Sequence, residues 1–247
     1  MKFRRWPSLM LALMVAGCGD AGHHPTATVL EMTVISDAPG RLAPDRSDWN
    51  AASVLVSQAT TAGLVSLNGD GEAVPALAQS WRVSDDGYSY IFRLADVEWS
   101  DGRKVVGRDF VTLFRDILKP RSRHPFKPYL QALENAADVA AGRKPVTALG
   151  VSSPMSDIVE LRLSSPRPAF LQLLGQPEMA LPARDGGRIT LGPYRVTRTE
   201  ASITMLTLDD QHAEEENAAS GGIKLIAEPD AEAAITRYKA GQIALLT

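Results

Sequence analysis

The chain of 247 residues, 45% of them hydrophobic and 22% charged, is long and apolar enough for one large or two small folded domains. Its formal net charge is −3. The first 17 residues hold three basic residues and no acid, so the remainder has 23 basic residues (26 − 3) against 29 acidic ones, a net charge of −6. An acidic balance without a dense basic patch opposes phosphate binding, which argues against a nucleic-acid-binding protein.

The amino terminus has the pattern of a bacterial lipoprotein precursor. A positively charged start precedes the apolar run 9–15, which is far shorter than the about 20 residues that a membrane-spanning helix needs. We therefore interpret residues 1–17 as a signal peptide. Residues 15–18 read Val-Ala-Gly-Cys and match the lipobox, in which the cysteine sulfur carries the diacylglycerol. This predicts lipidation at Cys18, the only cysteine of the chain; the alternative is a chance cysteine behind an ordinary secretory signal.

Residues 18–28 are mostly small and are predicted to be a tether between the lipid anchor and the fold. They include His23 and His24, which could bind a metal ion, but no third ligand lies nearby in the sequence. A solvated linker without a metal is the simpler interpretation. The expected location is the periplasm, with the protein held on the inner or outer membrane through its lipid anchor only.

Hydrophobic periodicity then predicts alternating strands and helices. Ser47 or Asp48 is expected to cap the first helix, and Ser84–Gly87 to form a turn between two strands. In the second of these strands the side chains are expected to alternate, with Tyr88, Tyr90, Phe92 and Leu94 on one face. Up to residue 118 the expected elements are strand 29–36, helix 49–61, strands 64–67, 81–83 and 88–94, and a helix beginning at Asp109 with a core-facing stripe of Phe110, Leu113, Phe114, Ile117 and Leu118.

The carboxyl-terminal half continues the same alternation, and Asp230 is expected to cap its last helix. The expected elements are helix 128–141, strands 146–151 and 158–163, a short helix 168–174, strands 194–196, 203–208 and 223–227, a helix from Asp230 to Gly241, and strand 243–246. No internal repeat is found.

Catalytic motifs are absent from the sequence: it has no Gly-x-Ser-x-Gly, phosphate-binding loop, His-Glu-x-x-His or Cys-x-x-Cys. Two pairs of carboxylates, Asp85-Asp86 and Asp209-Asp210, could serve acid–base chemistry. Adjacent residues on a strand or turn point apart, however, and Asp-Asp-Gly is ordinary turn chemistry. We therefore predict that the protein is not an enzyme and has no cofactor.

An ordered set of motifs runs from residue 70 to residue 243, within a resemblance that covers nearly all of residues 29 to 247. It resembles the family of periplasmic extracellular solute-binding proteins that serve peptide, nickel and opine ABC importers. No single motif is specific, but their order and spacing are. The motifs are Asp70-Gly71-Glu72, Val74 to Ala78, Trp81, Ser84 to Tyr88, Tyr90, Phe92, Leu94, Trp99-Ser100-Asp101-Gly102, Pro128-Tyr129-Leu130, Leu149-Gly150-Val151, Leu161-Arg162-Leu163, Pro166, Pro168, Phe170-Leu171, Leu191-Gly192-Pro193-Tyr194, Pro229-Asp230 and Ala240 to Ile243.

The resemblance implies an α/β fold: a periplasmic-binding-protein-like lobe over residues 29–247, with a mixed sheet and a smaller α+β subdomain inserted at about 70–185. Five aromatic residues are expected in its core: Trp81, Tyr88, Tyr90, Phe92 and Trp99. The chain stops where relatives cross into their second lobe, which implies that it corresponds to the amino-terminal half only, with the second lobe absent, as a truncation, a split-gene product or a half-protein.

The resemblance also implies the ligand contacts. In the family, the groups of this lobe that face the ligand lie in the loop after the first strand and near the Gly-Pro-Tyr segment. Mapped here, these are Ser36, Asp37 and Ala38, and Leu191, Gly192, Pro193 and Tyr194. Backbone groups at these positions could bind an extended peptide.

The function implied is that of the substrate-binding component of an ABC importer, which captures peptides or similar small solutes in the periplasm. Its expected partners are the solute and the ABC permease subunits, without nucleic acid. Peptide, nickel-chelate and opine binders share these motifs, so the ligand class stays open. Two alternatives stand beside this function: a degenerate lipoprotein interaction module that has lost ligand binding, and, more remotely, a periplasmic hydrolase using Asp85, Asp86 or Asp209.

Overall fold

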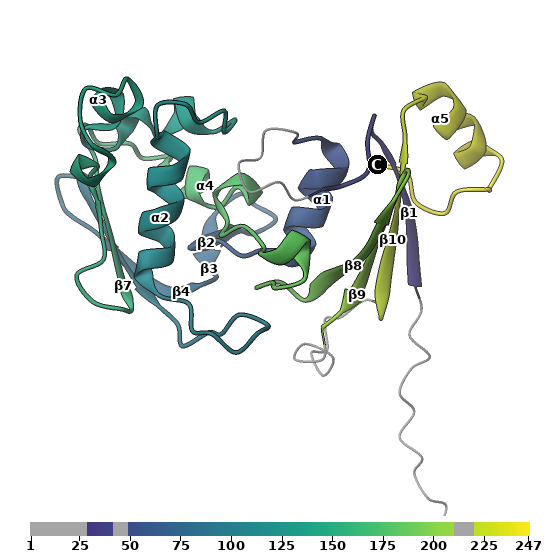
Figure 1. Cartoon of the computed structure of the whole chain (residues 1–247), viewed down its shortest axis with the longest axis horizontal. Coiled ribbons are helices and arrows are strands. Elements are labelled where there is room, and N and C mark those ends of the chain that lie inside the picture. The colour runs from purple at the N-terminus through teal and green to yellow at the C-terminus, as the bar shows by residue number, and fades with distance from the viewer. Residues whose placement is uncertain (1–28, 42–48, 210–219) are drawn as a thin grey trace, which may run out of the picture.

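The computed structural model describes residues 29–41, 49–209 and 220–247. The predicted signal peptide, Cys18, the tether, the two proposed cap residues Ser47 and Asp48, and Asp210 lie outside the described residues. Among the described helices, none combines the length and the apolar character that crossing a membrane would require. Figure 1 shows two α/β parts, which we call the sheet part and the inserted part.

The sheet part contains a four-stranded mixed sheet in the order β1-β10-β9-β8. β1 runs parallel to β10, while β10–β9 and β9–β8 are antiparallel, and Thr33 of β1 also bridges to Leu246. This pairing confirms the predicted mixed sheet. Figure 1 shows α1 on one side of the sheet and α5 on the other. The elements are β1 (Val29–Ile35), α1 (Ala51–Thr60), β8 (Tyr194–Glu200), β9 (Ile203–Leu208), β10 (Gly222–Glu228) and α5 (Ala231–Lys239).

The inserted part lies between α1 and β8 in the chain. Its main sheet is antiparallel with the order β4-β5-β7-β6, and a hairpin of β2 and β3 stands apart from it. Its elements are β2 (Val65–Leu67), β3 (Ala73–Pro75), β4 (Ala78–Val83), β5 (Ser89–Leu94), α2 (Gly107–Leu118), α3 (Ala136–Ala140), β6 (Val151–Ser152), β7 (Ile158–Arg162), α4 (Phe170–Leu174) and four 3₁₀ helices, η1 (Lys127–Ala132), η2 (Val146–Ala148), η3 (Pro177–Met179) and η4 (Asp185–Gly187).

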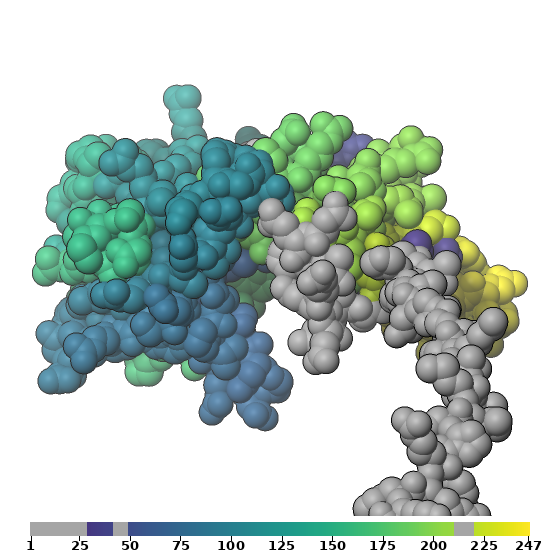
Figure 2. Space-filling view, turned by 90° about the horizontal axis from the view of Figure 1, so that it is seen from below, coloured from purple at the N-terminus to yellow at the C-terminus, as the bar shows by residue number. Residues whose placement is uncertain are grey.

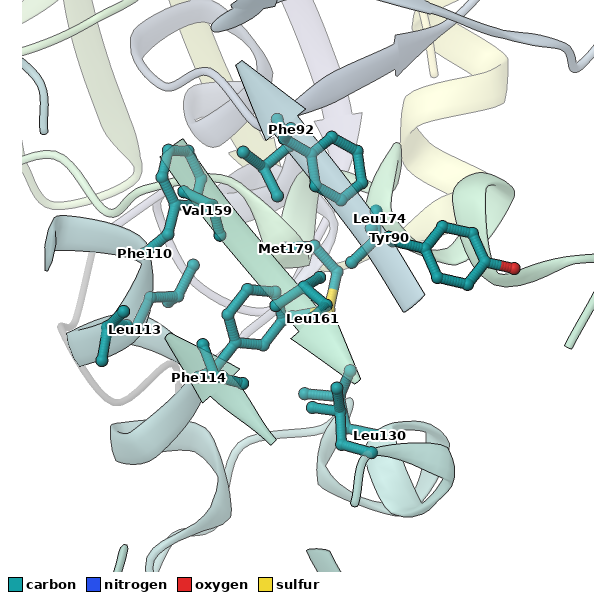
Figure 3. Packing of buried hydrophobic residues seen from close by; sticks show 14 of the residues in the cluster. Tyr90, Phe92, Phe110, Leu113, Phe114, Leu130, Val159, Leu161, Leu174 and Met179 are labelled. Carbon is teal, nitrogen blue, oxygen red and sulfur yellow. The ribbon is translucent and has the colours of Figure 1, made fainter. Parts of the chain in front are cut away.

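The core of the inserted part lies between α2 and the sheet. The predicted stripe of α2 is buried, with Phe110 and Phe114 facing Phe92 of β5 and Leu161 of β7 (Figure 3). Alternation in β5 follows the prediction, because Tyr90, Phe92 and Leu94 are buried while Ile91 and Arg93 are exposed. This part, expected to be the smaller, holds a core of 30 buried residues against five in the sheet part.

One of the five predicted core aromatics is not buried. Trp99 is 1% exposed, Tyr90 and Phe92 are buried and Trp81 is partly buried against them. Tyr88 is 43% exposed, so its prediction was wrong. The reason is that Tyr88 precedes β5 and belongs to the turn, where its N–H donates to Asp86 Oδ1.

Three predicted elements differ from the structure, and one of them is strand 243–246, where only Leu246 forms a bridge, to Thr33 of β1. Helix 128–141 is divided into η1 and α3, because Asn135 takes a left-handed conformation (φ 63°) and Leu133 bridges to Leu163. Strand 146–151 is a 3₁₀ turn followed by only two strand residues, Val151 and Ser152. In residues 128–141 and 146–151 the backbone bonds to residues far away in the sequence: the N–H of Glu134 donates to Arg162 O, and the N–H of Gly150 donates to Glu134 O.

Helix caps were predicted with mixed success. Asp230 caps α5 as expected, since its Oδ1 accepts the N–H groups of Glu232 and Ala233. For α1 the cap is Asn50, whose Oδ1 accepts the N–H of Ser53 at 2.8 Å. Asn50 is a favoured capping residue that the sequence reasoning passed over.

Candidate ligand-binding site

The loop after β1 is fixed to the sheet and to α1. Ser36 is buried, its N–H donates to Glu228 O (3.1 Å) and its Oγ donates to Ala38 O (2.9 Å). Two residues further on, Gly40 O accepts the Thr204 hydroxyl at 3.0 Å. The loop is therefore ordered by its own contacts.

Gly40 lets the loop pass close to the first turn of α1. A Cβ at this position would lie 2.6 Å from Ala52 O, so only glycine lets the loop pass this close to the first turn of the helix. The N–H of Arg41 donates to Ser53 Oγ at 3.3 Å and adds a second link to that turn. The loop and the amino-terminal end of α1 thus form one surface at one end of the sheet.

On this surface Asp37 is exposed and Ala38 is half-buried. The N–H of Asp37 donates to no backbone oxygen among the described residues. The loop therefore presents a carboxylate and a backbone donor to solvent while its flanks are held in place.

The segment 191–194 has different surroundings. The N–H groups of Leu191 and Gly192 both donate to Thr60 O, at 3.1 and 3.2 Å. A Cβ at Gly192 would lie 2.5 Å from Ala59 O, so the segment packs directly on the last turn of α1. Pro193 O accepts the N–H of Asp209 at 2.8 Å. The backbone groups that were predicted to face a ligand are thus engaged within the protein.

Tyr194 is also engaged internally. Its side chain is 8% exposed and its hydroxyl donates to Ser220 O at 2.9 Å. Leu191 and Gly192 are buried as well, and Pro193 is half-buried. The segment therefore joins α1 to the start of β8.

The structure does not bring the two predicted segments together. Ile35 pairs with Glu228 at one end of the sheet. At the other end Val29, Gly222, Thr207 and Arg195 lie side by side across the four strands, and the pair of Tyr194 and Leu208 is next to them. About six residues at roughly 3.3 Å per residue put the two ends on the order of 20 Å apart. Ligand contact stays a prediction for both segments, but one small ligand cannot touch both.

A cavity of about 400 Å³ lies at the junction of the two parts, and the sequence reasoning missed it. The last turns of α1 form one wall, with Gln58 and Thr61, and the Gly175–Gln176 corner forms another. The volume is within the range of about 300 to 1,000 Å³ that is typical of small-molecule sites. The one signal in the sequence for an irregular region there is the Pro- and Gly-rich run 176–187.

Two described members of the acidic pairs, Asp86 and Asp209, are engaged within the protein. Asp86 Oδ1 accepts the Ser84 hydroxyl (2.6 Å) and the Tyr88 N–H (3.0 Å), and these bonds lower the pKa of Asp86 from its ordinary value of 3.8. A carboxylate held ionised in this way is a turn-former and a poor proton donor. Asp209 is buried in the sheet part, 3.8 Å from Arg195 Nη1. Among the described residues no cluster of His, Cys, Asp and Glu could hold a metal ion.

Known proteins resemble this chain in sequence. It is 37% identical over 144 residues to "Probable deoxycholate-binding periplasmic protein YgiS" of Escherichia coli. The aligned stretch covers 57% of this chain and 27% of that protein. This chain is 34% identical over 128 residues to "Periplasmic oligopeptide-binding protein OppA" of Salmonella typhimurium, which covers 51% and 23%. The matched stretch is thus less than a third of either relative.

Solved structures resemble it in fold. Listeria monocytogenes OppA bound to peptide superposes with a TM-score of 0.75 at 21% identity, over 88% of this chain and 46% of that one. The Escherichia coli murein tripeptide binding protein MppA gives a TM-score of 0.74 at 24% identity, over 88% and 45%. This chain thus spans about half the length of the solved proteins.

The family comparison covers the largest share of the chain. Residues 72–247 match the family described as "Bacterial extracellular solute-binding proteins, family 5 Middle". The matched stretch contains most of both cores and all strands of both main sheets except β1. The fold likeness and the sequence match agree, and this chain belongs to the family 5 bacterial extracellular solute-binding proteins, a family of binding proteins.

Proposed function

We propose that this protein captures peptides or similar small solutes for an ABC importer. The observation that carries the proposal is the family match over residues 72–247. Relatives named as oligopeptide-, murein-peptide- and dipeptide-binding proteins favour peptide as the ligand class. The two acidic pairs give the remote hydrolase alternative no support.

The proposed ligand surface is the loop after β1 with the amino-terminal end of α1. Ser36 fixes the loop, and Asp37 and Ala38 supply the backbone and carboxylate groups that an extended peptide would meet. Backbone recognition tolerates many side chains, which suits a peptide binder. Leu191, Gly192, Pro193 and Tyr194 are the competing proposal, at the opposite end of the sheet.

The location and the partners also belong to the proposal. The relatives named above are periplasmic by name, and the lipobox supports a mature protein that begins at a lipid-modified Cys18 and works beside ABC permease subunits. Mass spectrometry of the membrane fraction tests the anchor: a diacylated amino-terminal Cys18 is expected, and an unmodified soluble protein would contradict it. A Cys18→Ser variant serves as the matched control and is expected to lose the modification.

Calorimetric titration with a library of di- to pentapeptides tests the ligand class, with deoxycholate as a second arm because of the name of one relative. We expect saturable binding of peptides, weakened by Asp37→Pro, since proline removes the N–H of residue 37 and restricts the loop. Asp70→Pro, in an exposed turn of the inserted part, is a control on a distant loop. Binding of deoxycholate alone would reassign the ligand, and binding of neither would favour the degenerate interaction module.

A further inference from the structure

A second cavity, of about 640 Å³, lies in the inserted part, far from the loop after β1. One wall is the face of α2 that carries Arg108, Thr112 and Arg115. In Figure 1, α2 and β7 stand at the opposite end of the molecule from β1. The cavity therefore belongs to a different surface from the proposed peptide site.

The two arginines of this wall lack acidic partners. Arg108 and Arg115 are seven residues apart, which is about two helical turns, so they share one face of α2. Among the described residues neither forms a salt bridge within 4 Å, although six other arginines of the inserted part do. Two cations on one wall without a counter-ion favour an anion.

Arg115 adds a second, independent observation. Its Nε is buried and has no hydrogen-bond partner in the structure. A buried donor without an acceptor is destabilising, and such groups are rare in folded proteins. An oxyanion in the cavity would supply the missing acceptor.

The remaining lining of the cavity includes two carboxylates and a third arginine, Arg162. Glu160 lies there and accepts the Ser152 hydroxyl at 3.3 Å, and Glu134 is 3.7 Å from Arg162. Carboxylates would repel a second anionic group, but they accept hydrogen bonds from hydroxyls. The cavity is therefore cationic on one side and hydrogen-bond-accepting on the other.

From this arrangement we infer that the cavity is a second ligand site, for a small polyhydroxylated anion. Arg108 and Arg115 bind its phosphate or carboxylate group, and Glu160 accepts hydrogen bonds from its hydroxyls. The volume is within the range of small-molecule sites and exceeds what a bare phosphate ion fills.

Titration calorimetry of the protein with four probes tests this inference: glucose 6-phosphate, gluconate, glucose and inorganic phosphate. We expect either glucose 6-phosphate or gluconate to bind at least about tenfold more tightly than glucose and phosphate, because only they engage both walls. Which of the two binds identifies the anionic group. No saturable binding of either would overturn the inference, and so would phosphate alone binding equally well.

Variants locate the site. Arg108→Gln and Arg115→Gln are each expected to weaken binding about tenfold, since each removes a charged hydrogen bond. Arg121→Gln, an exposed arginine outside the cavity, makes the same change in net charge and is the matched control. Circular dichroism checks that the variants are folded. Because Arg108 is exposed, Arg108→Gln still tests the site if Arg115→Gln unfolds. Equal affinity in wild type and Arg108→Gln, or equal loss in Arg121→Gln, would contradict the assignment.

Discussion

The inserted part and the sheet part differ most in how they are stabilised. Among the described residues, the cluster of buried hydrophobic residues in the inserted part has 30 members, whereas the cluster in the sheet part has five, among them Val56 of α1 (Figure 2 shows both parts from below). The proposed peptide surface therefore lies on the less buried part, where local opening needs less free energy.

The largest effect is expected in the inserted part. Phe114→Ala removes a side chain that is 1% exposed at the centre of the core (Figure 3), and should lower the free energy of unfolding by about 3–5 kcal/mol. Chemical denaturation measures this. Ile91→Ala, on an exposed position of β5, is the control and should change stability by less than about 0.5 kcal/mol. A loss below about 1 kcal/mol for Phe114→Ala would mean that this core is loosely packed.

A smaller effect is expected in the sheet part. Leu206→Ala deletes a buried side chain of β9 beneath α1 and should cost about 2 kcal/mol, at the low end for such changes because the small cluster can relax. Hydrogen exchange should show the loss in β8 to β10 and leave α2 protected. Thr207→Ala, exposed on the same strand, is the control. Equal loss of protection in both parts would show that they unfold as one unit.

The contact between α1 and residue 192 provides a third test. Gly192→Ala would place a Cβ 2.5 Å from Ala59 O, so the backbone must move, at a cost of about 1–3 kcal/mol. Gly69→Ala is the matched control, since a Cβ at position 69 would have no other atom within 4 Å. Thermal melts compare the two. If both variants have the melting temperature of the wild type, the close contact between residue 192 and α1 does not stabilise the fold.

The smallest effect is expected at the exposed turn of the inserted part. Hydrogen bonds from Ser84 and Tyr88 lower the pKa of Asp86 below 3.8, so its carboxylate stabilises the fold above that pH, and this contribution disappears as the pH falls through the lowered pKa. The stability difference between wild type and Asp86→Asn should thus be constant near neutral pH and shrink in acid. A stability difference that stays the same between neutral and acid pH would contradict this.

Local sequence patterns predicted much of this fold. The stripe of α2, the alternation of β5 and the Asp230 cap depend on neighbours within a few residues, and each was predicted correctly. The division of helix 128–141 was not predictable in this way, because it depends on the pairing of Leu133 with the distant Leu163.

The site shows the same limit. The loop after β1 and the start of β8 lie at opposite ends of the sheet because of the order and direction of the strands. Local hydrophobic periodicity does not predict strand order. The pair Arg108 and Arg115 could have been found from its spacing of seven in a predicted helix. Its lack of acidic partners, however, depends on the packing of β6 and η2 beside α2.

Hydrogen exchange with and without saturating peptide tests the central claim most directly, namely that the ligand surface is the β1 end of the sheet. We expect slower exchange on peptide binding at residues 36–41 and in the first turn of α1, with residues 191–194 unchanged. Slower exchange confined to residues 191–194, or no change in either segment while peptide is bound, would contradict it.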